Sequence, residues 1–165
     1  MGDNPQFDLQ QLKWYVLFVR SNQEKRVAER LYARGIEHFL PCYESMRQWK
    51  DRRVGLQLPL FPGYVFVRIQ FAERNKALST PQVVSLVGNK TSPSAISDEE
   101  IAGIRLAIEY GKAKPHPYLN VGERVVITQG ALTGLEGLLI KIRNNTRVAV
   151  ALHSIARAFV VEGVS

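Results

Sequence analysis

The chain has 165 residues, of which 45% are hydrophobic and 22% are charged, and this ordinary globular composition argues against a disordered chain. Its 22 lysines and arginines outnumber 15 acids, so the net charge is +7. That surplus favours an anionic partner such as nucleic acid, although it also serves solubility alone. The single cysteine, Cys42, excludes an internal disulfide. No apolar run nears the ~20 residues that cross a bilayer, and the first residues lack a secretory pattern, so we expect a cytoplasmic protein with no membrane partner.

The chain is predicted to divide near residue 111. Pro115 and Pro117 alternate there with lysine and histidine. Such a stretch cannot continue a helix, because proline lacks a backbone N–H and biases the preceding residue towards extended geometry. We therefore predict an N-terminal domain over 1–111, a linker over 112–117 and a C-terminal domain over 118–165. A domain as small as the last one must be compact, which favours β structure.

The N-terminal part mixes strands and helices. Ser21–Glu24 matches a capping box and predicts a helix that ends at Gly35, while Ser97–Glu100 matches a second one. A short helix is expected over 72–79. Apolar or alternating segments predict strands at 14–19, 36–40, 42–49, 54–60, 64–69 and 83–87. Neighbouring strands are hairpin-like rather than strictly alternating with helices, so the predicted fold class is α+β.

The C-terminal part is predicted to be all β. Its short apolar segments predict strands at 121–128, 138–142, 147–152 and 157–161. Asn144–Asn145 can take positive φ in a tight turn between two of them. Short strands of this kind close into small barrels, which leaves no exposed sheet edge.

The sequence offers no set of residues for catalysis. The three histidines lie in separate elements, and His38, on a strand, is more typical of a packed residue than of a base. The acids Asp98–Glu100 complement a helix N-terminus. The glycines near residue 134 lie between strands rather than before a helix, unlike a phosphate-binding loop. We therefore expect no enzyme, no cofactor and no metal.

Two groups of basic residues are candidates for nucleic-acid binding. On the first helix Arg26, Arg30 and Arg34 recur every four residues and form one ridge, with Arg20 just before the helix. The ridge either contacts an anion or is a solvated face partly paired by Glu24 and Glu29. The second group surrounds the predicted hairpin turn and consists of Arg47, Lys50, Arg52 and Arg53.

Trp49 stands beside the second basic group. An aromatic ring next to cations can stack on a nucleic-acid base. An aromatic residue in a strand can equally serve ordinary cross-strand packing. The sequence leaves both interpretations open.

These patterns together resemble the NusG family of transcription elongation factors, from Trp14 to about Val161. In the N-terminal part the resemblance rests on Trp14–Val16, Phe61–Val67, Val87–Gly88 and the run from Pro93 to Ile101. In the C-terminal part it rests on a KOW motif that begins at Val121–Val125 and continues through the glycines at 130, 134 and 137. A KOW motif alone has low specificity, because ribosomal proteins also carry it.

The resemblance implies an NGN-type antiparallel sheet with flanking helices, followed by a small SH3-like (KOW) barrel. It implies that the first domain docks on the clamp helices of RNA polymerase through an apolar surface formed by Trp14, Tyr64, Phe66 and Leu86. Each of these residues could instead be core packing. It further implies that Arg20, Arg26, Arg30 and Arg34 face the non-template or upstream DNA, and that the barrel recruits a ribosomal protein or the terminator Rho.

The expected function is therefore a bacterial elongation or antitermination factor that suppresses pausing or modulates termination. The stretch from Gly35 to Leu60 resembles the specialised RfaH-like and UpxY-like members, although Glu73–Ala77 lacks the His-Thr-Thr by which RfaH reaches a second polymerase element. The alternative is a ribosome-associated structural protein that binds RNA through its KOW domain.

Overall fold

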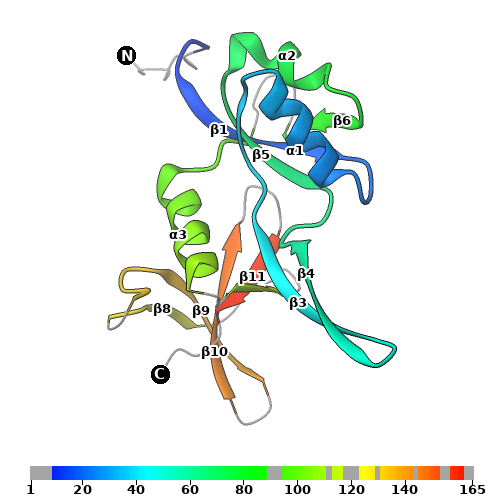
Figure 1. The fold of residues 1–165 in the computed structure, drawn as a ribbon. Coiled ribbons are helices and arrows are strands. Elements are labelled where there is room, and N and C mark those ends of the chain that lie inside the picture. The colour runs from blue at the N-terminus through cyan, green and yellow to red at the C-terminus, as the bar shows by residue number, and fades with distance from the viewer. Residues whose placement is uncertain are drawn as a thin grey trace, which may run out of the picture. The chain divides into compact units, whose positions relative to one another are not determined.

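The computed structural model describes residues 9–88, 94–110, 113–116, 123–128, 131–142, 145–152 and 157–161 (Figure 1). The chain forms two compact units, the first made of residues 1–40 and 63–97 and the second of residues 41–62 and 98–165. Within the described residues the fold is mixed α+β, with three α-helices and antiparallel sheets, which confirms the predicted class.

The first unit is built on a four-stranded antiparallel sheet with the strand order β2-β5-β1-β6. Its strands are β1 (Leu12–Val19), β2 (Glu37–Phe39), β5 (Tyr64–Gln70) and β6 (Val83–Leu86). The helices α1 (Glu24–Ala33) and α2 (Arg74–Leu78) belong to the same unit, and a 3-10 turn (Phe71–Glu73) precedes α2 (Figure 1).

The core of this unit lies between the helices and one face of the sheet. Alternate residues of β1 and β5 point to it, because side chains alternate along a strand. The buried members are Tyr15, Leu17, Val19, Val27, Leu31, Ile36, Val65, Val67, Ile69, Phe71 and Ala77. Each large aliphatic side chain buried here stabilises the fold by about 1.5–3 kcal/mol, so this layer supplies much of the unit's stability.

One polar atom lies inside that core. Tyr15 is fully buried, and its hydroxyl has no hydrogen-bond partner within the described part of the chain. Burial raises the pKa of Tyr15 above its ordinary value of 10.0, because the phenolate would be desolvated there. The ring packs near Phe71, with 5.9 Å between ring centroids.

Helix α1 ends as predicted but begins differently. Gly35 has φ +70°, and the N–H of Ile36 donates to the carbonyl of Leu31 at 3.0 Å, which is the expected glycine-terminated end. The predicted capping box is wrong, since the N-cap residue is Gln23 and no side chain caps the helix. Glu24 is instead buried, and its carboxylate accepts a hydrogen bond from the N–H of Gly63 at 2.9 Å.

The second unit contains a hairpin, a helix and a five-stranded sheet. The hairpin strands β3 (Cys42–Trp49) and β4 (Arg52–Pro59) pair with each other in a two-stranded sheet, and α3 spans Asp98–Glu109. The larger sheet has the order β7-β11-β10-β9-β8 and is antiparallel throughout. Its strands are β7 (Ala113–His116), β8 (Glu123–Val126), β9 (Glu136–Ile142), β10 (Asn145–Leu152) and β11 (Arg157–Val161).

Residues 113–116, predicted as linker, form strand β7 and pair with β11. Pro115 is tolerated because β7 is an edge strand, where a missing N–H need not break the ladder. The predicted domain boundaries and barrel closure stay predictions: within the described residues, no pairing joins β7 to β8. Of the predicted turn, Asn145 begins β10 and Asn144 lies outside the described residues.

Candidate polymerase and nucleic-acid surfaces

The sheet face opposite the helices of the first unit is aromatic. The β1–β5 register pairs Val16 with Phe66 and Phe18 with Tyr64, so these side chains share the face that α1 and α2 do not cover. The rings of Phe18 and Tyr64 lie 5.7 Å apart between centroids. Phe39 of β2 extends the face, with its ring centroid 6.1 Å from that of Phe66. Three of the four predicted docking residues, Trp14, Tyr64 and Phe66, therefore lie on one face.

Most of this aromatic face is closed to solvent in this conformation. Trp14 is 4% exposed, Phe66 is fully buried and Tyr64 is 9% exposed. The backbone of Trp14 also forms a bridge with Ile96. Trp14 and Phe66 are therefore packed as core residues in this conformation, which is the alternative that the sequence left open. Their role in polymerase docking stays a prediction. The exposed ring on this face is Phe18, at 41%, while Phe39 is half-buried.

Leu86 does not share the aromatic face. It pairs with Leu17 across β1 and β6 and packs, half-buried, against the core beneath the helices. The predicted grouping of Leu86 with the aromatic residues is thus wrong, since a side chain in that register points to the opposite side of the sheet. Phe18, which sequence reasoning missed, alternates with Trp14 and Val16, and that period-2 spacing was the available signal.

The arginine ridge of α1 is used partly by the fold itself. Arg34 donates from Nη1 to the carbonyl of Lys76 at 3.1 Å and to Oγ of Ser79 at 2.9 Å. These acceptors lie at the C-terminal end of α2, where unpaired carbonyls favour a cation. Arg30 donates to the carbonyl of Pro81 at 3.2 Å. Two of the three ridge residues therefore hold α1 against α2 and the turn that follows it.

The remaining cations of the ridge face solvent. Arg20 and Arg26 are exposed. Neither Glu24 nor Glu29 forms an ion pair with the ridge in the described part of the chain, and Glu24 is engaged by Gly63 instead. The predicted alternative was a solvated face partly paired by these two acids. The pairing is not found among the described residues, but Arg20 and Arg26 do face solvent, so the solvated face stays an alternative to anion binding. The positive charge of the ridge stays unneutralised and available to an anion.

The second basic group surrounds the tip of the β3–β4 hairpin, as predicted. Trp49 pairs with Arg52, which leaves Lys50 and Asp51 as a two-residue turn. The basic residues Arg47, Lys50, Arg52 and Arg53 are all exposed. Asp51 is the one acid among them, so the tip carries a net positive charge.

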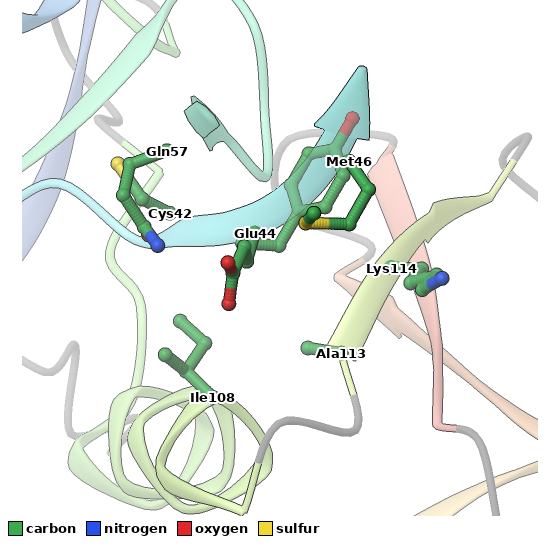
Figure 2. Close-up of a pocket in the computed structure, with 8 residues that line it drawn as sticks. Cys42, Glu44, Met46, Gln57, Ile108, Ala113 and Lys114 are labelled. Carbon is green, nitrogen blue, oxygen red and sulfur yellow. The ribbon is translucent and has the colours of Figure 1, made fainter. Parts of the chain in front are cut away.

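The second unit also contains a cavity of about 410 Å³. Figure 2 shows Glu44 of β3 facing the space that Ile108 of α3 and Ala113 of β7 border. Its other lining residues include Cys42, Met46 and Gln57 (Figure 2). The described residues hold no group of three or more His, Cys, Asp or Glu side chains that could bind a metal ion. A lone carboxylate and a lone thiol are not a nucleophile with its base, so the cavity supports no catalytic mechanism.

No α-helix in the part of the chain that the structure describes is both long and apolar enough to cross a membrane.

The geometry therefore defines an α+β protein whose candidate surfaces are apolar and basic rather than catalytic. Residues 12–105 match the family described as "Transcription termination factor nusG". The chain belongs to the NusG family, and it is a transcription termination/antitermination factor of that family rather than an enzyme.

Curated relatives named as NusG proteins match most of the chain. The transcription termination/antitermination protein NusG of Rickettsia bellii is 26% identical over 162 residues, which cover 91% of this chain and 85% of that protein. The corresponding protein of Buchnera aphidicola is 26% identical over 172 residues, covering 93% of each. A solved structure described as "Domain interaction in Thermotoga maritima NusG" matches 93% of this chain and 94% of that chain with a TM-score of 0.57 and 24% identity. That structural likeness supports the shared fold.

Proposed function

We propose that this NusG-family factor binds elongating RNA polymerase at the clamp helices through the aromatic face of its first unit. Bound there, it holds the non-template or upstream DNA with the arginines of α1 and of the β3–β4 hairpin. It suppresses pausing or modulates termination without bond chemistry, since binding one polymerase state more tightly than another is sufficient to shift their populations.

The observation that carries this proposal is the exposed end of the aromatic face. Phe18 is 41% exposed, although its neighbours in the same strand are buried. The N–H of Gly63 is held by Glu24, and the carbonyl of Gly63 accepts the N–H of Val19 at 2.8 Å. Gly63 has φ +87° in this bend. The ring of Phe18 packs against Gly63, since its Cε2 lies 3.4 Å from the position that a Cβ on residue 63 would take. A rigidly supported aromatic ring is the type of anchor that dominates protein interfaces.

The partners of the second unit follow from family resemblance alone. We propose that its KOW segment recruits a second protein, either a ribosomal protein or Rho, and that the chain is a specialised RfaH-like or UpxY-like member. A purely ribosomal role would leave the family match over residues 12–105 unexplained.

The test is recovery of purified core RNA polymerase on the immobilised full chain, without nucleic acid. Phe18→Ala should lower recovery by about tenfold or more, as loss of an interface anchor does. Tyr32→Ala is the matched control, because Tyr32 is an exposed aromatic residue (79%) on α1 and away from this face. Equal recovery of wild type and Phe18→Ala, with unchanged thermal melting, would remove the proposed docking face.

A further inference from the structure

We propose that one face of the β3–β4 hairpin is a stacking surface for unpaired bases of single-stranded nucleic acid, with Trp49 as the stacking residue. The inference rests on the proposed function insofar as that function assigns the hairpin's cations to DNA. It adds the residue that would distinguish a single strand from a duplex, which the cations alone do not.

The strand register places an aromatic ring and two guanidinium groups on the same face. Residues of β3 two apart share a face, so Trp49 and Arg47 point to one side. Their partners across the ladder are Arg52 and Val54, which point to that same side. The ring of Trp49 is thus flanked along its own strand by Arg47 and across the ladder by Arg52. Arg53 pairs with Gln48 and lies on the opposite face.

Trp49 is exposed to an extent that core packing does not explain. Its side chain is 65% exposed and forms no ring contact and no hydrogen bond within the described residues. Tryptophan is mostly buried in folded proteins, since its large ring loses most by facing water. The other tryptophan, Trp14, follows that rule at 4% exposure. The predicted alternative of ordinary cross-strand packing is therefore the weaker interpretation for Trp49.

The positive charges around the Trp49 ring favour a negatively charged ligand. Arg47, Lys50, Arg52 and Arg53 form no ion pair with an acid among the residues described. Lys50 has φ +51° in the two-residue turn, a conformation for which asparagine and glycine are the favoured residues. Turn geometry therefore does not account for a lysine there. An exposed ring among unpaired cations is complementary to a polyanion that also presents flat apolar faces.

Single-stranded nucleic acid has both properties in accessible form. In a duplex the base faces are covered by stacking and pairing, so only phosphates and groove edges would meet the hairpin, and Trp49 would have no base face to stack on. In a single strand each base has an open π-face, and stacking on an aromatic ring tolerates any base. This face is open in the structure, because Arg47, Trp49 and Arg52 are all exposed. No third strand pairs with β3 or β4 in the described part of the chain, so the hairpin stays a two-stranded ribbon (Figure 1).

The experiment measures binding of the full chain to a dT oligonucleotide and to a duplex of the same length, by fluorescence anisotropy at several salt concentrations. Trp49→Ala should weaken single-strand binding at least about fivefold and change duplex binding by less than about twofold. The salt dependence should stay as in wild type, because no charge is lost. Arg52→Gln should lower the salt slope by about 0.7–0.9 for either ligand, because one phosphate contact is removed.

Tyr32→Ala is the matched control for removal of an exposed aromatic residue and should bind both ligands as wild type does. Quenching of tryptophan emission by the dT oligonucleotide provides a second readout, since Trp14 is buried and Trp49 supplies the accessible signal. Unchanged single-strand affinity in Trp49→Ala, or equal weakening for single strand and duplex, would overturn the stacking role. Neither result would change the comparison of wild type and Phe18→Ala in polymerase recovery. The stacking proposal and the docking proposal can therefore be refuted independently.

Discussion

Strand pairs β1–β5 and β3–β4 have the same backbone pairing but differ in burial. Both are antiparallel and regular, with seven and eight residue pairs. Both faces of β1–β5 are largely buried, one of them under α1 and α2, whereas the outer half of β3–β4 is exposed on both faces. Backbone pairing alone thus does not distinguish a strand pair that forms the core from one that we propose to bind nucleic acid. The difference lies in what the side chains contact.

The basic residues divide in the same way. The arginines of α1 look like a binding ridge in the sequence, yet Arg30 and Arg34 are hydrogen-bonded to the α2 region. The arginines of the hairpin tip, by comparison, have no such acceptors among the residues described. We therefore expect substitutions in α1 to lower stability first and substitutions in the hairpin to lower binding first.

Among substitutions in α1 and in the hairpin, Glu24→Ala is expected to lower the free energy of unfolding most. Glu24→Ala removes a buried carboxylate and leaves the N–H of Gly63 without its acceptor. Hydrogen bonds to a charged group, together with the cost of an unpaired buried donor, predict a loss of about 2–3 kcal/mol in the free energy of unfolding. Urea denaturation measures it.

Two glutamates provide the controls for that loss. Glu29 is exposed on the same helix, and Glu44 is exposed on the hairpin. Glu29→Ala and Glu44→Ala should each change the free energy of unfolding by less than about 0.5 kcal/mol. A loss for Glu24→Ala no larger than theirs would show that the bond to Gly63 does not support the bend.

A smaller difference is expected between Arg34 and Arg52. Arg34→Ala removes hydrogen bonds to Lys76 and Ser79 and should cost about 1 kcal/mol of unfolding free energy, because the acceptors are exposed to water afterwards. Arg52→Ala should cost less than about 0.5 kcal/mol. Thermal and urea unfolding of the two variants side by side measure the contrast. Equal losses would contradict the division of roles between α1 and the hairpin.

The fold was largely predictable from the sequence because its elements follow local rules. Gly35 ends α1 as expected, and the hairpin tip and most strands fall close to the predicted residues. The errors arose where a tertiary contact replaced a local one. Glu24 could cap its own helix, yet it binds Gly63, 39 residues away. Residues 112–117 were predicted as linker because of Pro115 and Pro117, yet 113–116 form an edge strand, which accepts Pro115.

The candidate surfaces were less predictable. Residue type does not reveal which face of a strand is covered, so the sequence left Trp14 and Phe66 open between docking surface and core, and the structure buries both. Leu86 was grouped with them because the register of β6 against β1, which contains a bulge, is not readable from the sequence. The hydrogen bonds of Arg30 and Arg34 join segments more than 40 residues apart and had no local signal.

The smallest predicted effect concerns Tyr15, in the buried strand pair. Tyr15→Phe keeps the ring packed near Phe71 and removes a hydroxyl that has no partner in the described residues. Because that hydroxyl was desolvated without a compensating bond, the variant should be as stable as wild type at neutral pH or more stable by up to about 1 kcal/mol. Tyr43, a half-buried residue of the hairpin strand β3, provides the control: Tyr43→Phe should change the free energy of unfolding by less than about 0.5 kcal/mol.

Alkaline pH should separate wild type from Tyr15→Phe more clearly. The folded-state pKa of Tyr15 is raised, so above the unfolded value of about 10 the unfolded chain loses this proton while the folded chain keeps it. The folded state then binds more protons, and stability falls as pH rises towards the folded pKa, by at most about 1.4 kcal/mol per pH unit from this group. Urea unfolding at pH 9 and pH 11 should show a smaller loss in Tyr15→Phe than in wild type. Equal losses would mean that the Tyr15 hydroxyl reaches solvent in the folded chain, so that its pKa is not raised.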